Sequence, residues 1–154
     1  MAETDSRVVI TNRKARHEYF ILETMEVGIV LKGTEVKSLR NGSANLQDSY
    51  AMIRQGELWL MNMHISPYEK GNINNHAPTR SRKLLVQKKQ LRKLLARVHE
   101  KGLSLIPLSV YFKARYAKVE LAIAQGKKSH DKREAIAKRD AQREIAQRLK
   151  RSAS

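Results

Sequence analysis

The chain has 154 residues, and 31 lysines and arginines against 15 aspartates and glutamates give it a formal net charge of +16. A charge this large lowers stability by self-repulsion, so it indicates a polyanionic partner, with nucleic acid favoured over an anionic membrane surface. The absence of cysteine excludes disulfides, thiolate zinc sites and thiol nucleophiles, and it fits a cytoplasmic protein. The polar residues 1–6 are not typical of a signal peptide, and no apolar run reaches about 18 residues, the length of a membrane span.

The first 42 residues change from an irregular start to a strand and a helix. Residues 1–16 are polar and basic and show no clear period. The alternation of apolar side chains over 19–31 predicts a strand. Thr34 is placed to cap a short helix that runs through Arg40 and ends at the Asn-Gly pair 41–42.

A hairpin and a long loop follow. Apolar stretches at 50–54 and 57–63 flank Gln55 and Gly56, which is the pattern of two strands joined by a tight turn. Residues 66–80 hold two prolines, one glycine and three asparagines and predict a loop. Loops of about 15 residues inside compact domains are usually functional or disordered.

The second half of the chain predicts one helix and two strands. Leucine and valine recur at helical spacing over 91–98, and Gly102 is placed to end that helix. The stretch 103–113 is strand-like, but its apolar phase reverses at Pro107, which predicts a β-bulge or an edge. Alternation over 119–123 predicts a final half-buried strand.

These elements predict a mainly β fold with α-helices, a closed β-barrel of the oligonucleotide-binding type with flanking helices. Residues 1–125 would form the barrel domain and carry +10 of the charge. Residues 126–154 hold ten lysines and arginines against four acidic residues, with few apolar side chains. We expect them to form a flexible basic tail, disordered when free and helical in a narrow anionic groove. The alternative is a solvated terminus without a function.

Catalytic and metal-binding patterns are absent from the sequence. No histidine has a second histidine or a carboxylate at metal-ligand spacing, and no phosphate-binding loop or nucleophile elbow is present. Glu23 and Glu26 are placed beside a turn, and Asp48 is placed at the start of a strand. We therefore expect no enzyme, no metal and no cofactor, and we assign no role to His99 or to the loop at 66–80.

Binding features are richer. One basic cluster lies near the first strand and another follows the long loop: Arg13, Lys14 and Arg16, then Arg80, Arg82 and Lys83. Such clusters neutralise phosphates. The chain has one tryptophan, five tyrosines and two phenylalanines, too few to stack many bases. The composition favours recognition of a folded RNA by its shape and backbone.

Six motifs resemble one family, the small protein B family of bacterial partners of transfer-messenger RNA (tmRNA, or SsrA RNA). They are NRKARHEY at 12–19, ETMEVG at 23–28, GTEVKSLR at 33–40, DSY at 48–50, RxRKLL at 80–85 and GKKxHDKR at 126–133. The match runs in order along most of the chain. Strings such as GTEVKSLR are too long for coincidence.

The resemblance implies an oligonucleotide-binding barrel that grips the tRNA-like domain of tmRNA. It also implies a function in trans-translation: the complex enters stalled ribosomes, tags the nascent peptide for proteolysis and frees the ribosome. The family is not one of enzymes. Its tail occupies the empty mRNA channel near the decoding centre of the 16S rRNA, where it would become helical. One copy per tmRNA and no membrane contact are expected.

The resemblance and the basic clusters together give the expected RNA-facing residues. On the barrel they are Asn12, Arg13, Lys14, Tyr19, Glu26, Arg80, Arg82, Lys83, Leu85 and Lys118. In the tail, ribosome-facing positions are Lys127, Lys128, His130, Asp131, Lys132 and Arg133. Two alternatives remain: a generic RNA-binding or ribosomal protein with the same fold, and an RNA-processing enzyme that uses the barrel as its binding half.

Overall fold

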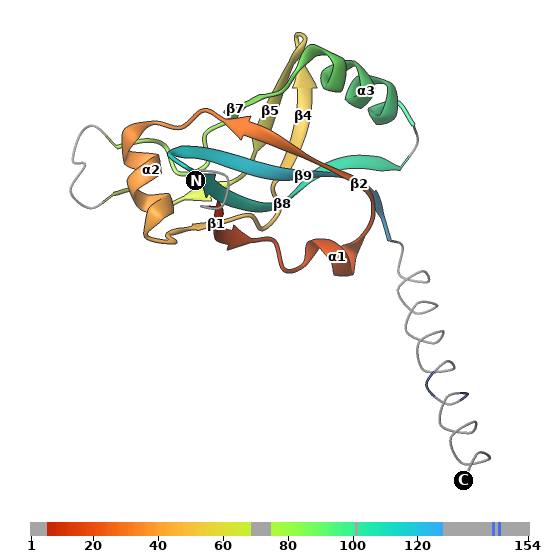
Figure 1. The fold of residues 1–154 in the computed structure, drawn as a ribbon, viewed down its shortest axis with the longest axis horizontal. Coiled ribbons are helices and arrows are strands. Elements are labelled where there is room, and N and C mark those ends of the chain that lie inside the picture. Colours follow the sequence, from red (N-terminus) through yellow and green to blue (C-terminus); the bar gives the residue numbers. More distant parts are fainter. Residues whose placement is uncertain (1–5, 69–74, 101, 128–142, 144, 146–154) are drawn as a thin grey trace.

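The computed structural model describes residues 6–68, 75–100, 102–127, 143 and 145 (Figure 1). Its elements in chain order are β1 (Ser6–Thr11), α1 (Ala15–Glu18), β2 (Tyr19–Ile29), α2 (Gly33–Arg40), β3 (Ala44–Asn45), β4 (Tyr50–Arg54), β5 (Glu57–Met61), β6 (His64–Ile65), β7 (Arg82–Leu85), α3 (Lys88–Val98), β8 (Leu103–Lys113) and β9 (Tyr116–Gly126). The prediction of a mainly β fold with a few helices is confirmed.

Six of the strands close into a ring. The large sheet has the order β1-β8-β4-β5-β7-β2-β9, and an additional pairing of β8 with β9 closes the six strands from β8 to β9 into the ring. β1 lies outside the ring and pairs with the same edge of β8 that also meets β4. All these pairs are antiparallel, and β3 with β6 forms a separate two-stranded sheet.

The interior of the ring is the main hydrophobic core. Strand alternation turns one face of each strand inward, and α2 and α3 add Leu39 and Leu94, both fully buried. A second, smaller cluster lies where α1 covers the outer face of β8 and β9. It consists of Ala15, Ile106, Leu108, Ala122 and Ala124. In Figure 1, α2 lies at the left end of the ring, α3 at its upper right and α1 below.

Two local predictions are confirmed by backbone geometry. Gln55 and Gly56 have φ values of 54° and 74°, the left-handed pair that a two-residue hairpin turn requires, and they join β4 to β5. The register of β8 against β9 shifts between Pro107 and Ser109, which is the predicted bulge.

Several element boundaries differ from the predictions because long-range contacts decide them. The irregular start contains β1, a strand formed by pairing with β8 about 100 residues later. α2 begins at Gly33, and its first turn is capped by the Glu35 carboxylate, which accepts the Lys32 N–H at 2.8 Å. Thr34 is therefore not the cap; its hydroxyl bonds His76 Nδ1 at 3.0 Å.

The remaining corrections concern α3 and two carboxylates. α3 runs from Lys88 to Val98, so it ends before Gly102, whose φ of 81° belongs to the turn into β8. Glu23 and Glu26 do not flank a turn; both lie within the 11-residue strand β2. Of the long connection expected at 66–80, residues 69–74 lie outside the described part.

Candidate nucleic-acid interface

The outer face of the ring carries a row of four cross-strand neighbours. Leu85 of β7 pairs with Gly28 of β2, Gly28 with Lys118 of β9, and Lys118 with Tyr111 of β8. Direct partners in antiparallel strands point to the same face. The adjacent residue Val27 faces the buried core, so this row faces outward. Two of the expected RNA-facing residues, Leu85 and Lys118, thus come together with Tyr111.

Glu26 lies beside this row and is held by two neighbours. Tyr111 donates its phenolic hydrogen to Glu26 Oε2 at 2.5 Å, and Lys113 Nζ lies 3.8 Å from the same oxygen. Burial, together with the hydrogen bond to Glu26, raises the pKa of the Tyr111 phenol above its usual value. Tyr111 therefore stays protonated and orients the Glu26 carboxylate, which remains 42% exposed.

Gly28 allows Leu85 to lie across β2. A Cβ at Gly28 would sit 3.2 Å from Leu85 Cβ, closer than ordinary van der Waals contact. With only hydrogen there, the leucine packs against the strand while its side chain stays 53% exposed beside Lys118. The result is an apolar surface next to a cation and a carboxylate, which suits contact with a nucleobase edge or a ribose.

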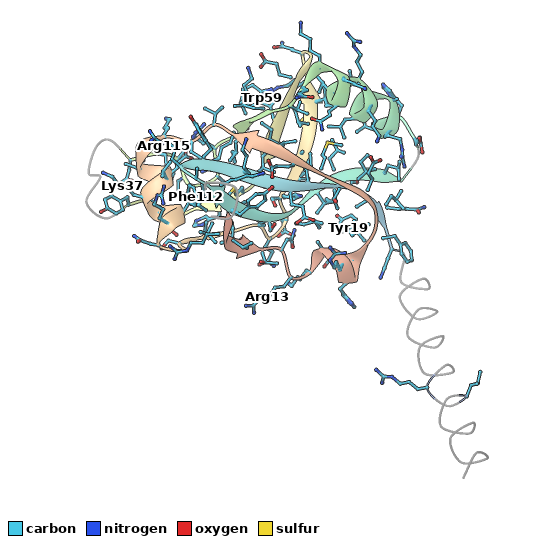
Figure 2. The ribbon with its side chains drawn as sticks, in the orientation of Figure 1. Arg13, Tyr19, Lys37, Trp59, Phe112 and Arg115 are labelled. Carbon is cyan, nitrogen blue, oxygen red and sulfur yellow. The ribbon has the colours of Figure 1, made fainter. Side chains whose placement is uncertain are left out.

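Lys83 extends this face toward the hairpin. It pairs with Trp59 of β5, and its carbonyl accepts the N–H of Val30 at 3.0 Å. The Lys83 ammonium lies 3.3 Å from Glu57, and the Arg54 guanidinium lies 5.6 Å from the centre of the Trp59 ring. Figure 2 shows Trp59 on the hairpin side of the ring, beside α3.

The four N-terminal site residues lie elsewhere, around α1. Asn12 donates its side-chain amide to Pro107 O at 3.0 Å and so supports the bulge in β8. Arg13 and Lys14 are exposed, and Tyr19 is half-buried against the small cluster under α1. Figure 2 shows Arg13 and Tyr19 at the α1 end of the molecule, away from Trp59. The expected surface is therefore divided into two parts.

Arg82 is not a surface residue, which corrects its assignment to the RNA-facing set. Its side chain is fully buried and donates to Glu35 Oε2 at 2.5 Å, Met63 O at 2.5 Å and Pro78 O at 3.0 Å. Arg80, 23% exposed, also binds the buried Glu35 carboxylate. Both arginines thus tie the start of β7 and the residues just before it to α2.

Glu35 stays ionised inside this cluster. Its burial alone would raise the pKa, but hydrogen bonds from Arg80, from the Lys32 N–H and from Arg82 outweigh burial and lower the pKa below its usual value. His76 adds a further tie, because its ring bonds Thr34 on one side and Ile65 O, at 2.8 Å, on the other.

Only the first of the tail residues can be placed. Lys127 donates its backbone N–H to Glu18 O at 2.8 Å, and its ammonium lies 3.3 Å from Arg16 O and 4.7 Å from the centre of the Phe20 ring. The C-terminal segment therefore leaves the ring beside α1. The other tail positions, Lys128, His130, Asp131, Lys132 and Arg133, lie outside the described residues.

Tyr111 is the functional candidate that the sequence predictions missed. The apolar phase of 108, 110 and 112 already placed it on the outer face, but nothing local indicated its partner, 85 residues away. In the described part of the chain, no three histidine, cysteine, aspartate or glutamate side chains gather to hold a metal ion. None of the described helices is both long and apolar enough to cross a membrane.

Comparison with known proteins identifies the family. The model of the family described as SmpB protein matches residues 9–151. The chain belongs to the SmpB family. It is 65% identical over 146 residues to the SsrA-binding protein of Desulforudis audaxviator, covering 95% of each chain. It is 59% identical to that of Carboxydothermus hydrogenoformans over 94% of this chain and 97% of the relative.

A solved structure agrees with this membership. A chain of the structure described as "tmRNA-SmpB: a journey to the center of the bacterial ribosome" superposes with a TM-score of 0.68 at 54% sequence identity. The match covers 82% of this chain and 93% of that one. That chain therefore resembles this one in both sequence and fold.

Proposed function

We propose that the protein binds tmRNA and acts as a non-enzymatic adaptor of trans-translation. It delivers tmRNA to stalled ribosomes for rescue and peptide tagging. It works in the cytoplasm, with one copy bound to each tmRNA. The observation that carries this proposal is the group Glu26, Leu85 and Lys118 on one outer face of a chain whose relatives are SsrA-binding proteins. The closed six-stranded ring supports a barrel of the oligonucleotide-binding type.

The proposal divides the work between two parts of the chain. Residues 1–125 bind the tRNA-like domain, and residues 126–154 lie in the empty mRNA channel at the decoding centre. This division is supported by charge, because +10 and +6 fall on the two parts and each then meets its own anionic partner. The exit of Lys127 beside α1, away from the Glu26 face, leaves both parts free to bind at once.

Glu26 is the specific element of the proposed surface. A carboxylate that faces phosphates costs affinity unless it accepts hydrogen bonds from a base or a 2′-hydroxyl. The bond from Tyr111 fixes one oxygen of the Glu26 carboxylate, and the exposed remainder can accept from an amino or hydroxyl group of the RNA. The lysines on the same face, Lys118 and Lys83, supply phosphate contacts.

The test compares two substitutions that change the net charge equally. Glu26→Gln and Glu100→Gln each remove one exposed carboxylate. Glu100 lies two residues past the end of α3 and forms an ion pair only with Arg97 among the described residues. If affinity for a tRNA-like fragment were set by bulk charge, both variants would bind more tightly. We expect Glu26→Gln to bind more weakly and Glu100→Gln to bind as well as the unsubstituted protein. Equal behaviour of the two would contradict readout by Glu26.

A further inference from the structure

Lys127, which follows the last residue of β9, is held against the ring by three contacts. Its backbone N–H donates to Glu18 O at 2.8 Å, one position beyond the last pair of β2 with β9. Its ammonium lies 3.3 Å from Arg16 O and 4.7 Å from the centre of the Phe20 ring. We call these contacts of Lys127 with Arg16, Glu18 and Phe20 the Lys127 clamp. They leave the lysine half-buried, although the resemblance counts it among the ribosome-facing tail residues.

The clamp supplies hydrogen-bond donors that α1 lacks. α1 is a single turn, Ala15–Glu18, and the last four carbonyls of a helix have no partner within it. The Tyr19 N–H bonds to Ala15 O, and Lys127 supplies donors to Arg16 O and Glu18 O. A cation at the C-terminus of a helix also complements its dipole. Because a single turn is not stable alone, α1 depends on such partners.

Phe20 gives the ammonium a second partner, on β2. Its ring is 41% exposed, so the lysine side chain lies over an aromatic surface that is open to solvent. At exposed sites, a cation within about 6 Å of a ring centre shifts an equilibrium about two- to fivefold. The clamp therefore joins three parts of the molecule: α1, the start of β2 and the first residue after β9.

The position of the clamp matters because the proposed channel-binding segment begins here. In Figure 1 the chain leaves β9 at the α1 end of the ring. A segment that leaves from a fixed point in a fixed direction loses less conformational freedom when it enters a channel, since part of the ordering has already taken place. With the ring bound to the tRNA-like domain, a fixed direction also raises the effective concentration of the segment at the channel.

We propose that Lys127 is a positioning residue, which sets the direction in which the C-terminal segment leaves the ring. This proposal rests on the proposed function, because it concerns how the segment reaches the mRNA channel. It differs from the expectation that the Lys127 side chain contacts the ribosome. The ammonium acts on Arg16 O and on the Phe20 ring, and its effect on the ribosome is exerted through the segment that it directs.

Two substitutions break the clamp from opposite sides. Lys127→Met keeps a long side chain but removes the ammonium. Phe20→Leu keeps an apolar side chain and the net charge but removes the ring. Lys128→Met is the matched control, because it removes the same charge one position further along, where no contact with the ring is proposed. Lys127→Arg is the conservative variant, since it keeps a cation that can donate to Arg16 O and lie over Phe20.

The first measurement is hydrogen exchange of the backbone amide at position 127, followed by NMR on the free full-length protein. This amide exchanges when its bond to Glu18 O opens, and the protection factor corrects for the change of side chain. We expect Lys127→Met and Phe20→Leu to lower the protection factor about two- to fivefold. Lys127→Arg and Lys128→Met should leave it unchanged. Unchanged protection in Lys127→Met would overturn the proposal.

The second measurement is the rate of peptide tagging on stalled ribosomes, with binding of a tRNA-like fragment measured in parallel. Lys127→Met and Phe20→Leu should each slow tagging about two- to fivefold while binding of the fragment stays unchanged. The double variant should be no slower than Lys127→Met, because both substitutions remove the same contact. Lys127→Arg should restore the rate.

A direct contact of Lys127 with ribosomal RNA would give a different pattern. Phe20→Leu would then tag at the normal rate, and Lys127→Met and Lys128→Met would be equally slow; this result would overturn the proposal. If the unsubstituted protein supported no tagging at all, the proposed function would fail. The protection factors of the free protein would still decide whether the clamp exists.

Discussion

Replacing Glu35 by glutamine tests the buried cluster that ties α2 to the segment before β7. Glu35 is fully buried and accepts hydrogen bonds from Arg80 Nε at 3.0 Å, Arg82 Nε at 2.5 Å and the Lys32 N–H at 2.8 Å. In the variant, Arg82 keeps its bonds to two carbonyls but loses its counter-charge while remaining fully buried. Removing one partner of a buried ion pair costs about 3–5 kcal/mol.

The lower end of that range applies here, because Arg80 is 23% exposed and can turn toward water. A loss of about 3 kcal/mol would lower the urea midpoint by about 1–3 M for a urea dependence of about 1–3 kcal/mol per M. The assay is urea unfolding at pH 7 followed by Trp59 fluorescence. Glu57→Gln is the matched control, because its exposed pair with Lys83 is worth about 0–1 kcal/mol.

The pH dependence gives an independent check on the same substitution. The folded-state pKa of Glu35 lies below the ordinary value of 4.5, so its contribution to stability is complete above that value and is lost as the pH falls through the folded-state pKa. The difference in stability between Glu35→Gln and the unsubstituted protein should therefore shrink below about pH 4.5. Urea midpoints that matched those of Glu57→Gln at pH 7 would refute the assignment.

Further predictions concern the Glu26 face and the tail. Gly28→Ala should leave the urea midpoint nearly unchanged. It should weaken binding of a tRNA-like fragment severalfold, because the new Cβ displaces Leu85. An affinity that calorimetry shows to be unchanged would contradict this prediction. Tyr111→Phe should reduce the affinity for the tRNA-like fragment less than Glu26→Ala does, because it frees the Glu26 carboxylate without removing it. A larger loss of affinity in Tyr111→Phe than in Glu26→Ala would show that Tyr111 contacts RNA itself. Glu26→Ala should cost more affinity than neutralising one tail lysine, and equal losses would argue against specific readout. Removing residues 132–154 should leave tmRNA binding nearly intact yet abolish tagging on stalled ribosomes; loss of RNA binding would refute the division of labour.

Local sequence signals predicted the parts of the fold that local chemistry decides. The hairpin turn at Gln55 and Gly56 and the bulge at Pro107 depend on a few neighbouring residues, and both are confirmed. β1 was missed because its short apolar run becomes a strand only against β8. The start of α2 was misplaced because its cap comes from Glu35 within the helix rather than from Thr34.

In the candidate site, too, the features that depend on contacts between distant parts of the chain could not be predicted from local sequence. Glu26, Leu85 and Lys118 came from the family resemblance, and the register places them on one face. Arg82 was assigned from the family resemblance and from its basic neighbours, although it shares a face of β7 with the buried Leu84. The apolar phase of its neighbours placed Tyr111 on the outer face, but its role had no local signal, because that role depends on a bond to Glu26 across the intervening strand β9.

The most direct test of the account is competition binding of a labelled tRNA-like fragment of tmRNA against an excess of bulk tRNA, at low and high salt. Each phosphate contact on a duplex lowers the logarithm of the binding constant by about 0.9 for each tenfold rise in salt concentration. Binding that is purely electrostatic should therefore be lost at high salt. The account predicts a complex that survives both the competitor and the salt, because the Glu26 face reads a shaped site. Complete displacement by bulk tRNA would contradict it and leave a basic RNA-binding protein without a specific partner.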